Sequence, residues 1–84
     1  MKTYTISASW DESRIFHADD SNLWSLGSSI EEAVYVAWEM EPVTRMSSWG
    51  LAQRLLNGES VVFSYHGVDF ATLQLKGNEF SLIE

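Results

Sequence analysis

Hydrophobic and polar residues alternate at the start of the chain. Over residues 3–10 every second side chain is apolar and the intervening positions are threonine or serine, which is the period of two of a half-buried strand. The polar residues 11–13 then predict a turn, and residues 14–18 predict a short second strand, antiparallel to the first. The predicted buried side of the first strand holds Tyr4, Ile6, Ala8 and Trp10.

A helical repeat follows at residues 28–40. Ser28 with Glu31, or Ser29 with Glu32, has the spacing of a reciprocal capping box, in which the hydroxyl and the glutamate each satisfy a free N–H at the helix start. Pro42 is expected to end this helix. Its predicted buried face, at helical spacing, consists of Ile30, Ala33, Val34 and Ala37.

The four residues before this helix, 23–26, are expected to form a brief third strand or an ordered loop. Gly27 is expected to let the chain turn into the helix. After Pro42, Ser47 or Ser48 would cap a second, shorter helix that ends at Asn57-Gly58. The predicted apolar stripe of the second helix is Trp49, Ala52, Leu55 and Leu56.

Residues 59–83 predict a meander of three strands, with turns at His66-Gly67 and Gly77-Asn78. The whole pattern predicts one α+β domain spanning residues 1–84. Its antiparallel sheet would have about five strands with two helices on one face, in the order β-β-α-α-β-β-β.

Composition narrows the classes of protein to consider. The chain has 84 residues and no cysteine, so disulfides, thiolate metal sites and cysteine nucleophiles are excluded. Small secreted domains usually depend on disulfides, and no apolar segment after Lys2 resembles a signal peptide or spans a bilayer. We therefore expect a cytoplasmic protein that does not bind a membrane.

The net charge of −7 is unevenly distributed. Residues 1–42 hold eight acidic and two basic side chains, a net charge of −6, whereas residues 43–84 hold four acidic and three basic ones, a net charge of −1. The acidic half would repel nucleic acid and attract a basic protein. The alternative is that the acidity serves only solubility.

Residue patterns that carry enzymatic chemistry are missing from the sequence. His17 and His66 lie in different elements without metal-ligand spacing, and the chain has neither a nucleophile elbow nor a phosphate-binding glycine loop. Adjacent carboxylates such as Asp19-Asp20 point apart in a strand or helix and do not form an acid/base pair. The sequence therefore predicts a protein without enzymatic activity, metal or cofactor.

Aromatic residues outside the predicted core suggest a binding surface. Trp10 and Trp38 fit core positions, whereas Trp24 falls in a predicted loop and Trp49 in the first turn of the second helix. Tyr35, with Val36 and Met40, widens the apolar arc of the first helix beyond what one core requires. Core packing remains an alternative for each tryptophan. The predicted partner-binding residues are Asp11, Glu12, Asp19, Asp20, Trp24, Tyr35, Glu39 and Glu41.

The run 26–34, followed by Ala37 and Glu39, resembles the helix entry of the HicB-like antitoxin domain: a glycine, a small polar pair, an aliphatic residue and Glu-Glu-Ala. The resemblance covers about half of the chain. It implies a small sheet-and-helix domain that neutralises a ribonuclease toxin by covering its active surface. The family usually continues into a DNA-binding segment, whereas residues 43–84 of this chain predict a helix and a three-strand meander. We therefore do not infer from the resemblance that this chain binds operator DNA.

In general character, a compact acidic α+β chain of this size also resembles phage-encoded anti-CRISPR proteins, which often bind an effector's nucleic-acid surface. The first hypothesis is therefore a non-catalytic inhibitor that masks the basic surface of a nuclease, toxin or CRISPR effector. The second is a structural module that forms a homodimer through an edge strand or the spare helix face. The sequence leaves open whether the chain is a monomer or a homodimer.

Overall fold

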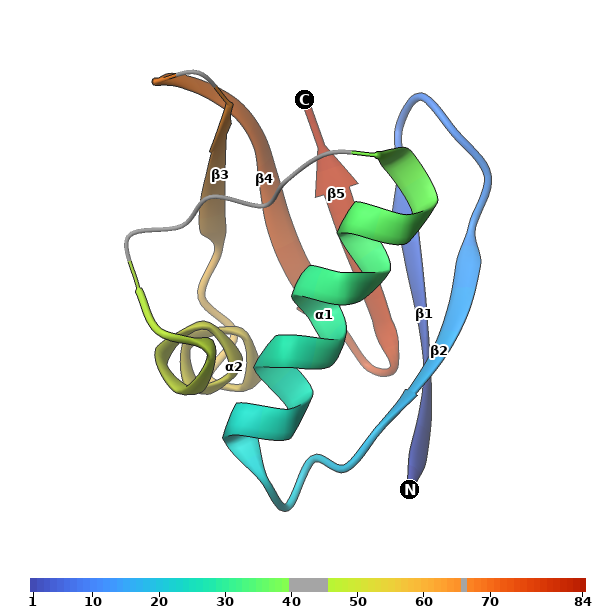
Figure 1. Cartoon of the computed structure of the whole chain (residues 1–84), viewed down its shortest axis with the longest axis vertical. Coiled ribbons are helices and arrows are strands. Elements are labelled where there is room, and N and C mark those ends of the chain that lie inside the picture. Colours follow the sequence, from blue (N-terminus) through green and yellow to red (C-terminus); the bar gives the residue numbers. More distant parts are fainter. Residues whose placement is uncertain (40–45, 66) are drawn as a thin grey trace.

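The computed structural model describes residues 1–39, 46–65 and 67–84 of the chain. It contains five strands and two helices in the predicted order (Figure 1), which confirms the α+β fold class. The elements are β1 (Lys2–Ala8), β2 (Arg14–Ala18), α1 (Leu23–Trp38), α2 (Ser48–Leu56), β3 (Val61–Tyr65), β4 (Val68–Lys76) and β5 (Glu79–Ile83).

The strands form one sheet in the order β2-β1-β5-β4-β3. Neighbours are antiparallel except for β1 and β5, which run parallel. The sheet is therefore mixed rather than antiparallel throughout. The first and last strands lie inside it, and β2 and β3 form its two edges.

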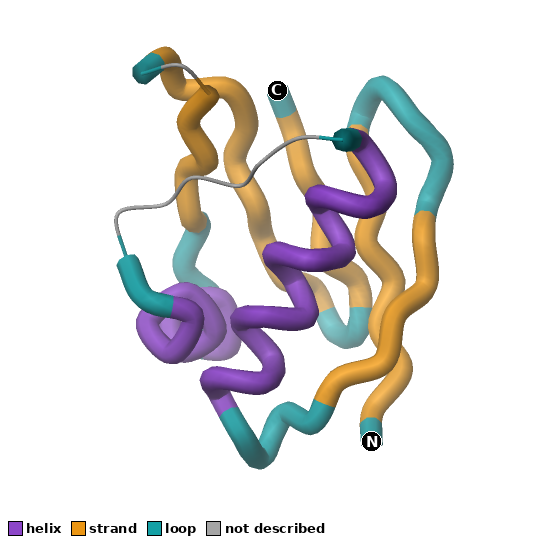
Figure 2. Tube along the Cα trace, viewed as in Figure 1, coloured by secondary structure: helices purple, strands orange, loops and turns teal. Residues whose placement is uncertain are grey.

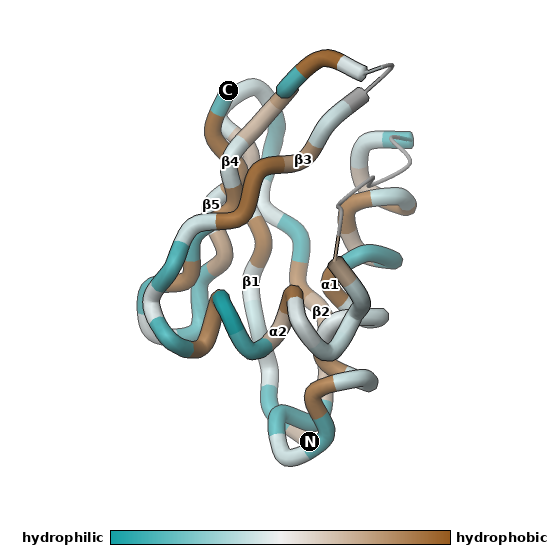
Figure 3. Tube along the Cα trace, turned by 90° about the vertical axis from the view of Figure 1, so that its left-hand side faces the viewer, coloured by the Kyte–Doolittle hydropathy of each residue, from teal (hydrophilic) through white to brown (hydrophobic). Residues whose placement is uncertain are grey.

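Both helices cover the same face of the sheet (Figures 1 and 2), with α1 against β2 and α2 against β3 and β4. Hydrophobic residues recur along the strands and along both helices (Figure 3), and the buried ones form a single core cluster. The core joins alternate strand residues to one stripe of each helix. Its largest fully buried side chains are Tyr4, Phe63, Phe80, Ile6, Leu26, Ile30, Leu51, Leu55, Leu73, Leu82, Val34 and Val61.

Helix α1 begins five residues before the predicted start. Asn22 is its N-cap, and the Asn22 side chain accepts a hydrogen bond of 3.2 Å from the Ser25 N–H. The prediction of a strand or loop at residues 23–26 is wrong, as is the capping box at Ser28 or Ser29. Asn22 satisfies the free N–H groups instead, so the chain is already helical when it reaches those serines.

Gly27 lies inside α1 and is buried, so the prediction that it forms the turn into the helix is also wrong. A β-carbon at Gly27 would clash with the carbonyl oxygen of Ser48 and lie 2.5 Å from its carbonyl carbon. At Gly27, α1 and the first residue of α2 therefore approach too closely for a β-carbon, and the lack of a side chain is what permits the approach.

The helix ends are partly as predicted. Helix α1 ends at Trp38, with Glu39 in the left-handed region at φ 51°, and the predicted stop at Pro42 lies outside the described residues. In α2 the N-cap is Ser47, the first of the two predicted candidates, and it accepts a hydrogen bond from Gly50 N–H at 3.1 Å. Gly58, at φ 84°, follows the C-cap of α2 and is consistent with the predicted stop.

Three residues that the sequence placed on an apolar face are largely exposed. Trp49 and Leu56 of α2 are 41% and 42% exposed, while Leu51, which the predicted stripe omitted, is buried. Strand β1 ends at Ala8, so Trp10 lies beyond the alternating segment and is 38% exposed. The three-strand meander is present as predicted, although His66 of its first turn lies outside the described residues.

Candidate protein-binding groove

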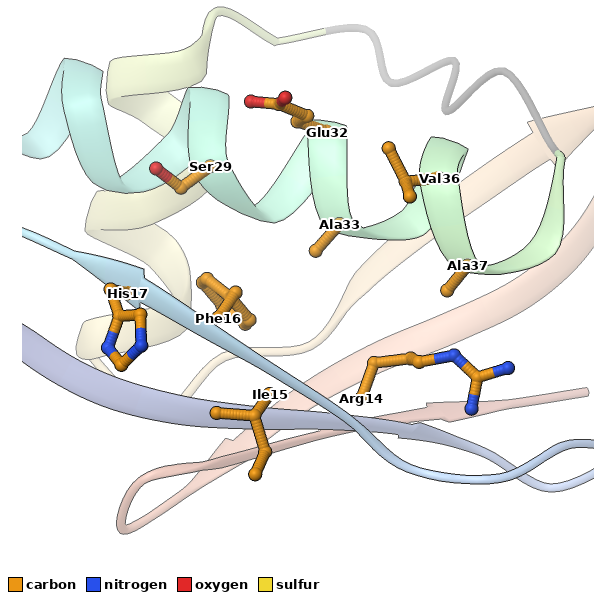
Figure 4. Close-up of a pocket in the computed structure, with 9 residues that line it drawn as sticks. All are labelled: Arg14, Ile15, Phe16, His17, Ser29, Glu32, Ala33, Val36 and Ala37. Atoms are coloured by element: carbon orange, nitrogen blue, oxygen red, sulfur yellow. The ribbon is translucent and has the colours of Figure 1, made fainter.

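A groove of about 400 Å³ lies between the edge strand β2 and helix α1 (Figure 4). The strand contributes four consecutive residues, and the helix contributes five residues from successive turns. We call it the α1–β2 groove. It is lined by Arg14, Ile15, Phe16, His17, Ser29, Glu32, Ala33, Val36 and Ala37.

The floor of the groove is apolar and firmly held. Phe16 points from β2 toward α1 (Figure 4) and stacks on the buried Tyr4 ring, with 5.6 Å between centroids and 20° between ring planes. Ala33 and Ala37 face it from the helix with side chains too short to fill the space. Small residues on α1 opposite a fixed aromatic ring on β2 therefore leave the groove open.

The rim of the groove combines apolar and charged side chains. Val36 of α1 is 69% exposed and Ile15 of β2 is 71% exposed. Arg14 forms a long ion pair of 3.7 Å with Glu12, and the His17 ring lies 3.1 Å from the Thr3 hydroxyl. Val36 gives a partner apolar surface to bury beside the groove, whereas the Ile15 side chain points away from α1 (Figure 4) and is exposed on the other face of β2.

Glu32 is the charged group of the helix wall. It is exposed, and within the described part of the chain it forms neither a hydrogen bond nor an ion pair. Its neighbour Glu31 accepts a hydrogen bond of 3.1 Å from the Ser48 hydroxyl and so belongs to the contact between the helices. These two glutamates are the only charged residues of α1, so the helix wall of the groove is acidic.

The structure divides the predicted acidic residues between two ends of the molecule (Figure 1). The turn that holds Asp11 and Glu12 lies at the same end as the C-terminal end of α1, where Glu39 is exposed. The loop that holds Asp19 and Asp20, between β2 and α1, lies at the opposite end. Glu41 lies outside the described residues.

Asp19 is held by its own loop. Its carboxylate accepts hydrogen bonds from the Ser21 hydroxyl at 2.6 Å and from the Ser21 N–H at 3.0 Å. These two bonds favour the charged form and lower the pKa of Asp19. Asp19 therefore shapes the entry to α1.

Asp20 is engaged by two neighbours on β1. Its carboxylate lies 3.4 Å from the Lys2 ammonium and accepts a hydrogen bond of 3.2 Å from the Tyr4 hydroxyl. Burial of the Tyr4 phenol, together with the adjacent negative charge of Asp20, raises the pKa of Tyr4 to about 12. Asp20 thus connects the loop to the core, and less of its charge is available to a partner.

Trp24 and Tyr35, the predicted aromatic anchors, are both on the surface, at 58% and 57% exposure. They lie eleven residues apart on α1, about three helical turns, and so share one stripe of the helix. Glu31, on the same stripe, contacts Ser48 of α2. The stripe thus runs along the side of α1 next to α2, whereas the groove is on the side next to β2.

The residues that line the α1–β2 groove were missed as binding residues. Arg14, Ile15 and Glu32 were assigned to a strand and a helix cap. Two signals were present: Val36 widens the apolar arc of the helix, and Ile15 is out of phase with the buried side of its strand. The two signals belong to one site only when β2 and α1 are placed side by side.

An aromatic cluster lies beyond the end of β1. The Trp10 ring meets Phe70 edge to face at a centroid distance of 5.1 Å and lies 6.4 Å from Trp38. The Trp38 indole N–H is buried and has no hydrogen-bond acceptor within the described residues. These rings account for the partial burial of Trp10 and Trp38, which the sequence assigned to the core.

The described residues contain no group of three or more histidine and acidic side chains placed to hold a metal ion. No described helix has the length and apolar character needed to cross a bilayer. No protein-family model, curated protein or solved structure matches the chain. The resemblances to HicB-like antitoxins and anti-CRISPR proteins therefore stay predictions.

Proposed function

We propose that the chain is a non-catalytic protein-binding domain that masks the basic, nucleic-acid-binding surface of another protein, such as a nuclease, toxin or CRISPR effector. The observation that carries the proposal is the α1–β2 groove: an open site with Phe16 at its floor, exposed Val36 at its rim, and Glu32, which has no partner among the described residues, on its helix wall. Apolar anchors beside an exposed carboxylate suit a partner that presents both apolar and basic side chains.

The charge of the whole chain supports this proposal. A net charge of −7 on 84 residues attracts a basic partner over a distance and speeds its capture. Asp11 and Glu12 lie in the exposed β1–β2 turn, close to the start of β2, and extend the negative field beyond the strand. We place this interaction in the cytoplasm, where nucleases and nucleic-acid complexes act.

The test is a comparison of three baits in a lysate of the native host: the natural chain, Glu32→Lys and Glu59→Lys. Glu59 is exposed and lies at the end of α2 outside the groove, so its variant matches the charge change at a distance. A protein that depends on Glu32 but not on Glu59 would then be purified and mixed with labelled nucleic acid.

We expect that protein to be basic and to lose its nucleic acid when the chain is added. If nothing depends on Glu32, or if the purified protein binds nucleic acid equally well with the chain bound, the proposal is wrong.

A homodimer is the second candidate, because β2 is an edge strand with an exposed isoleucine. Sedimentation at several protein and salt concentrations distinguishes the two. A dimer that persists in high salt supports an assembly module, since apolar and backbone contacts are not screened. A monomer at all concentrations excludes it.

A further inference from the structure

The hydrogen bonds of β1 show which way each of its peptide groups points. The Thr5 N–H donates to the Asn78 carbonyl, on the β5 side, at 3.0 Å. Peptide groups alternate in direction along a strand. The peptide groups of Tyr4 and Ile6 therefore point the other way, toward β2.

The alternation in β1 also determines which way the peptide groups of β2 point. Tyr4 is opposite Phe16 and Ile6 is opposite Arg14 in the antiparallel register, so Phe16 and Arg14 exchange hydrogen bonds with β1. The peptide groups of Ile15 and His17, which lie between and after them, point to the free edge. The close approach of the Thr3 and His17 side chains, at 3.1 Å, is typical of a pair that does not exchange backbone bonds.

The two edges of the sheet differ in how they are protected. Edge strand β3 has a register shift between Phe63 and Ser64, and an irregularity of this kind discourages pairing with another chain. Edge strand β2 pairs with β1 in an unbroken register over five residues and contains neither proline nor lysine. The edge that opens into the α1–β2 groove is therefore the regular one.

We infer that the α1–β2 groove binds an extended segment of the partner, which adds to β2 as a further strand. This inference rests on the proposed function and names the form of its ligand. The peptide groups of Ile15 and His17 would pair with the backbone of the segment. Alternate side chains of the segment would enter the groove over Phe16 and Ala33, where apolar groups fit best.

The charges around the groove favour a basic segment over a second copy of this chain. Arg14 already pairs with Glu12, while Glu32 on the opposite wall is exposed and unpaired within the described residues. A segment with a basic side chain near Glu32 complements that wall. A second copy of this chain would instead bring its own Glu32 and a further net charge of −7.

The test uses a synthetic peptide with blocked ends, long enough to span the five residues of β2. Because alternate side chains of a strand share one face, the positions that face the groove are valines with one arginine placed to meet Glu32, and the intervening positions are threonines. Amide NMR signals and amide hydrogen exchange of the full chain are recorded as the peptide is added. We expect the Ile15 and His17 amides to shift and to exchange at least about tenfold more slowly, as for amides in a formed ladder. The Phe16 amide, already paired with β1, should change little.

Two controls make the result specific. A peptide N-methylated at every second amide, which removes the donors that face β2, should not slow exchange at Ile15 or His17. Glu32→Gln should weaken binding of the original peptide about threefold to fivefold, as expected for losing a partly exposed ion pair. Glu59→Gln should leave the affinity unchanged.

The inference is overturned if the peptide leaves the Ile15 and His17 amides unprotected. If a basic protein still depends on Glu32 in the lysate comparison, the proposed function stands and only the strand addition falls. Protection of these two amides without peptide, increasing with protein concentration, would show that a second copy occupies the edge and would likewise overturn the inference.

Discussion

Replacing Gly27 with alanine is expected to destabilise the protein by about 2 kcal/mol, even though alanine is the better helix former. The new β-carbon would lie 2.5 Å from the carbonyl carbon and 2.8 Å from the α-carbon of Ser48. Ordinary contacts between carbon atoms are about 3.5–4 Å, so α1 and α2 would have to separate by roughly 1 Å.

The magnitude follows from two opposing effects. Forcing a methyl group into a packed interface costs about 3 kcal/mol at the upper end of the usual range, and alanine recovers about 1 kcal/mol of helix propensity relative to glycine. A domain of this size has a total stability on the order of 5 kcal/mol. The expected net loss is therefore a large share of the total.

Urea denaturation followed by tryptophan fluorescence and circular dichroism measures this loss. Gly50→Ala is the matched control, because a β-carbon at Gly50 would meet only the Ser47 hydroxyl at 3.4 Å and the Met46 β-carbon at 3.5 Å. We expect Gly50→Ala to stabilise the protein by about 0.5 kcal/mol. Equal stabilisation by both substitutions would refute the close contact of α1 and α2 at Gly27.

Two further predictions concern the cap and the buried phenol. Asn22→Ala should lower the free energy of unfolding by about 1 kcal/mol, whereas Ser28→Ala should change it by less than about 0.5 kcal/mol; equal losses in urea would contradict the cap assignment. Ultraviolet titration should show Tyr4 ionising with a pKa of about 12, which Asp20→Asn should lower. Because the folded state raises this pKa above 10, its stabilising contribution is complete below pH 10 and is lost as the pH rises through 12.

Local patterns predicted the strands well because burial on one side of a sheet produces an alternation of apolar and polar residues along the sequence. Tyr4, Ile6 and Ala8 are all buried, and the alternation that revealed them is a property of neighbouring residues. The cap of α2 was narrowed to Ser47 or Ser48 for the same reason, since the partner of Ser47 lies only three residues further along the chain.

The start of α1 could not be predicted in this way. A glycine four residues into a possible helix is normally a sign against that helix, and only the approach of Ser48 explains why Gly27 is there. The parallel pairing of β1 with β5 was likewise hidden, because it joins Thr5 to Glu79 across most of the chain.

The candidate site includes some features that local sequence patterns predict and others that depend on contacts between distant residues. The exposure of Trp24 and Tyr35 agrees with their assignment as surface aromatics. The groove itself depends on β2 lying beside α1, and on Ala33 being short where Phe16 is large. No local pattern contains that relation, so the acidic residues were predicted as one surface although the fold divides them.

The position of β5 has a consequence for how the protein is made. This strand joins the pair β1–β2 to the pair β4–β3. During translation the N-terminal hairpin leaves the ribosome long before its inner neighbour has been synthesised, and one side of β1 remains bare until residues 79–83 emerge. The sheet therefore closes late, and a nascent chain stalled before residue 79 would offer β1, as well as β2, to any strand nearby.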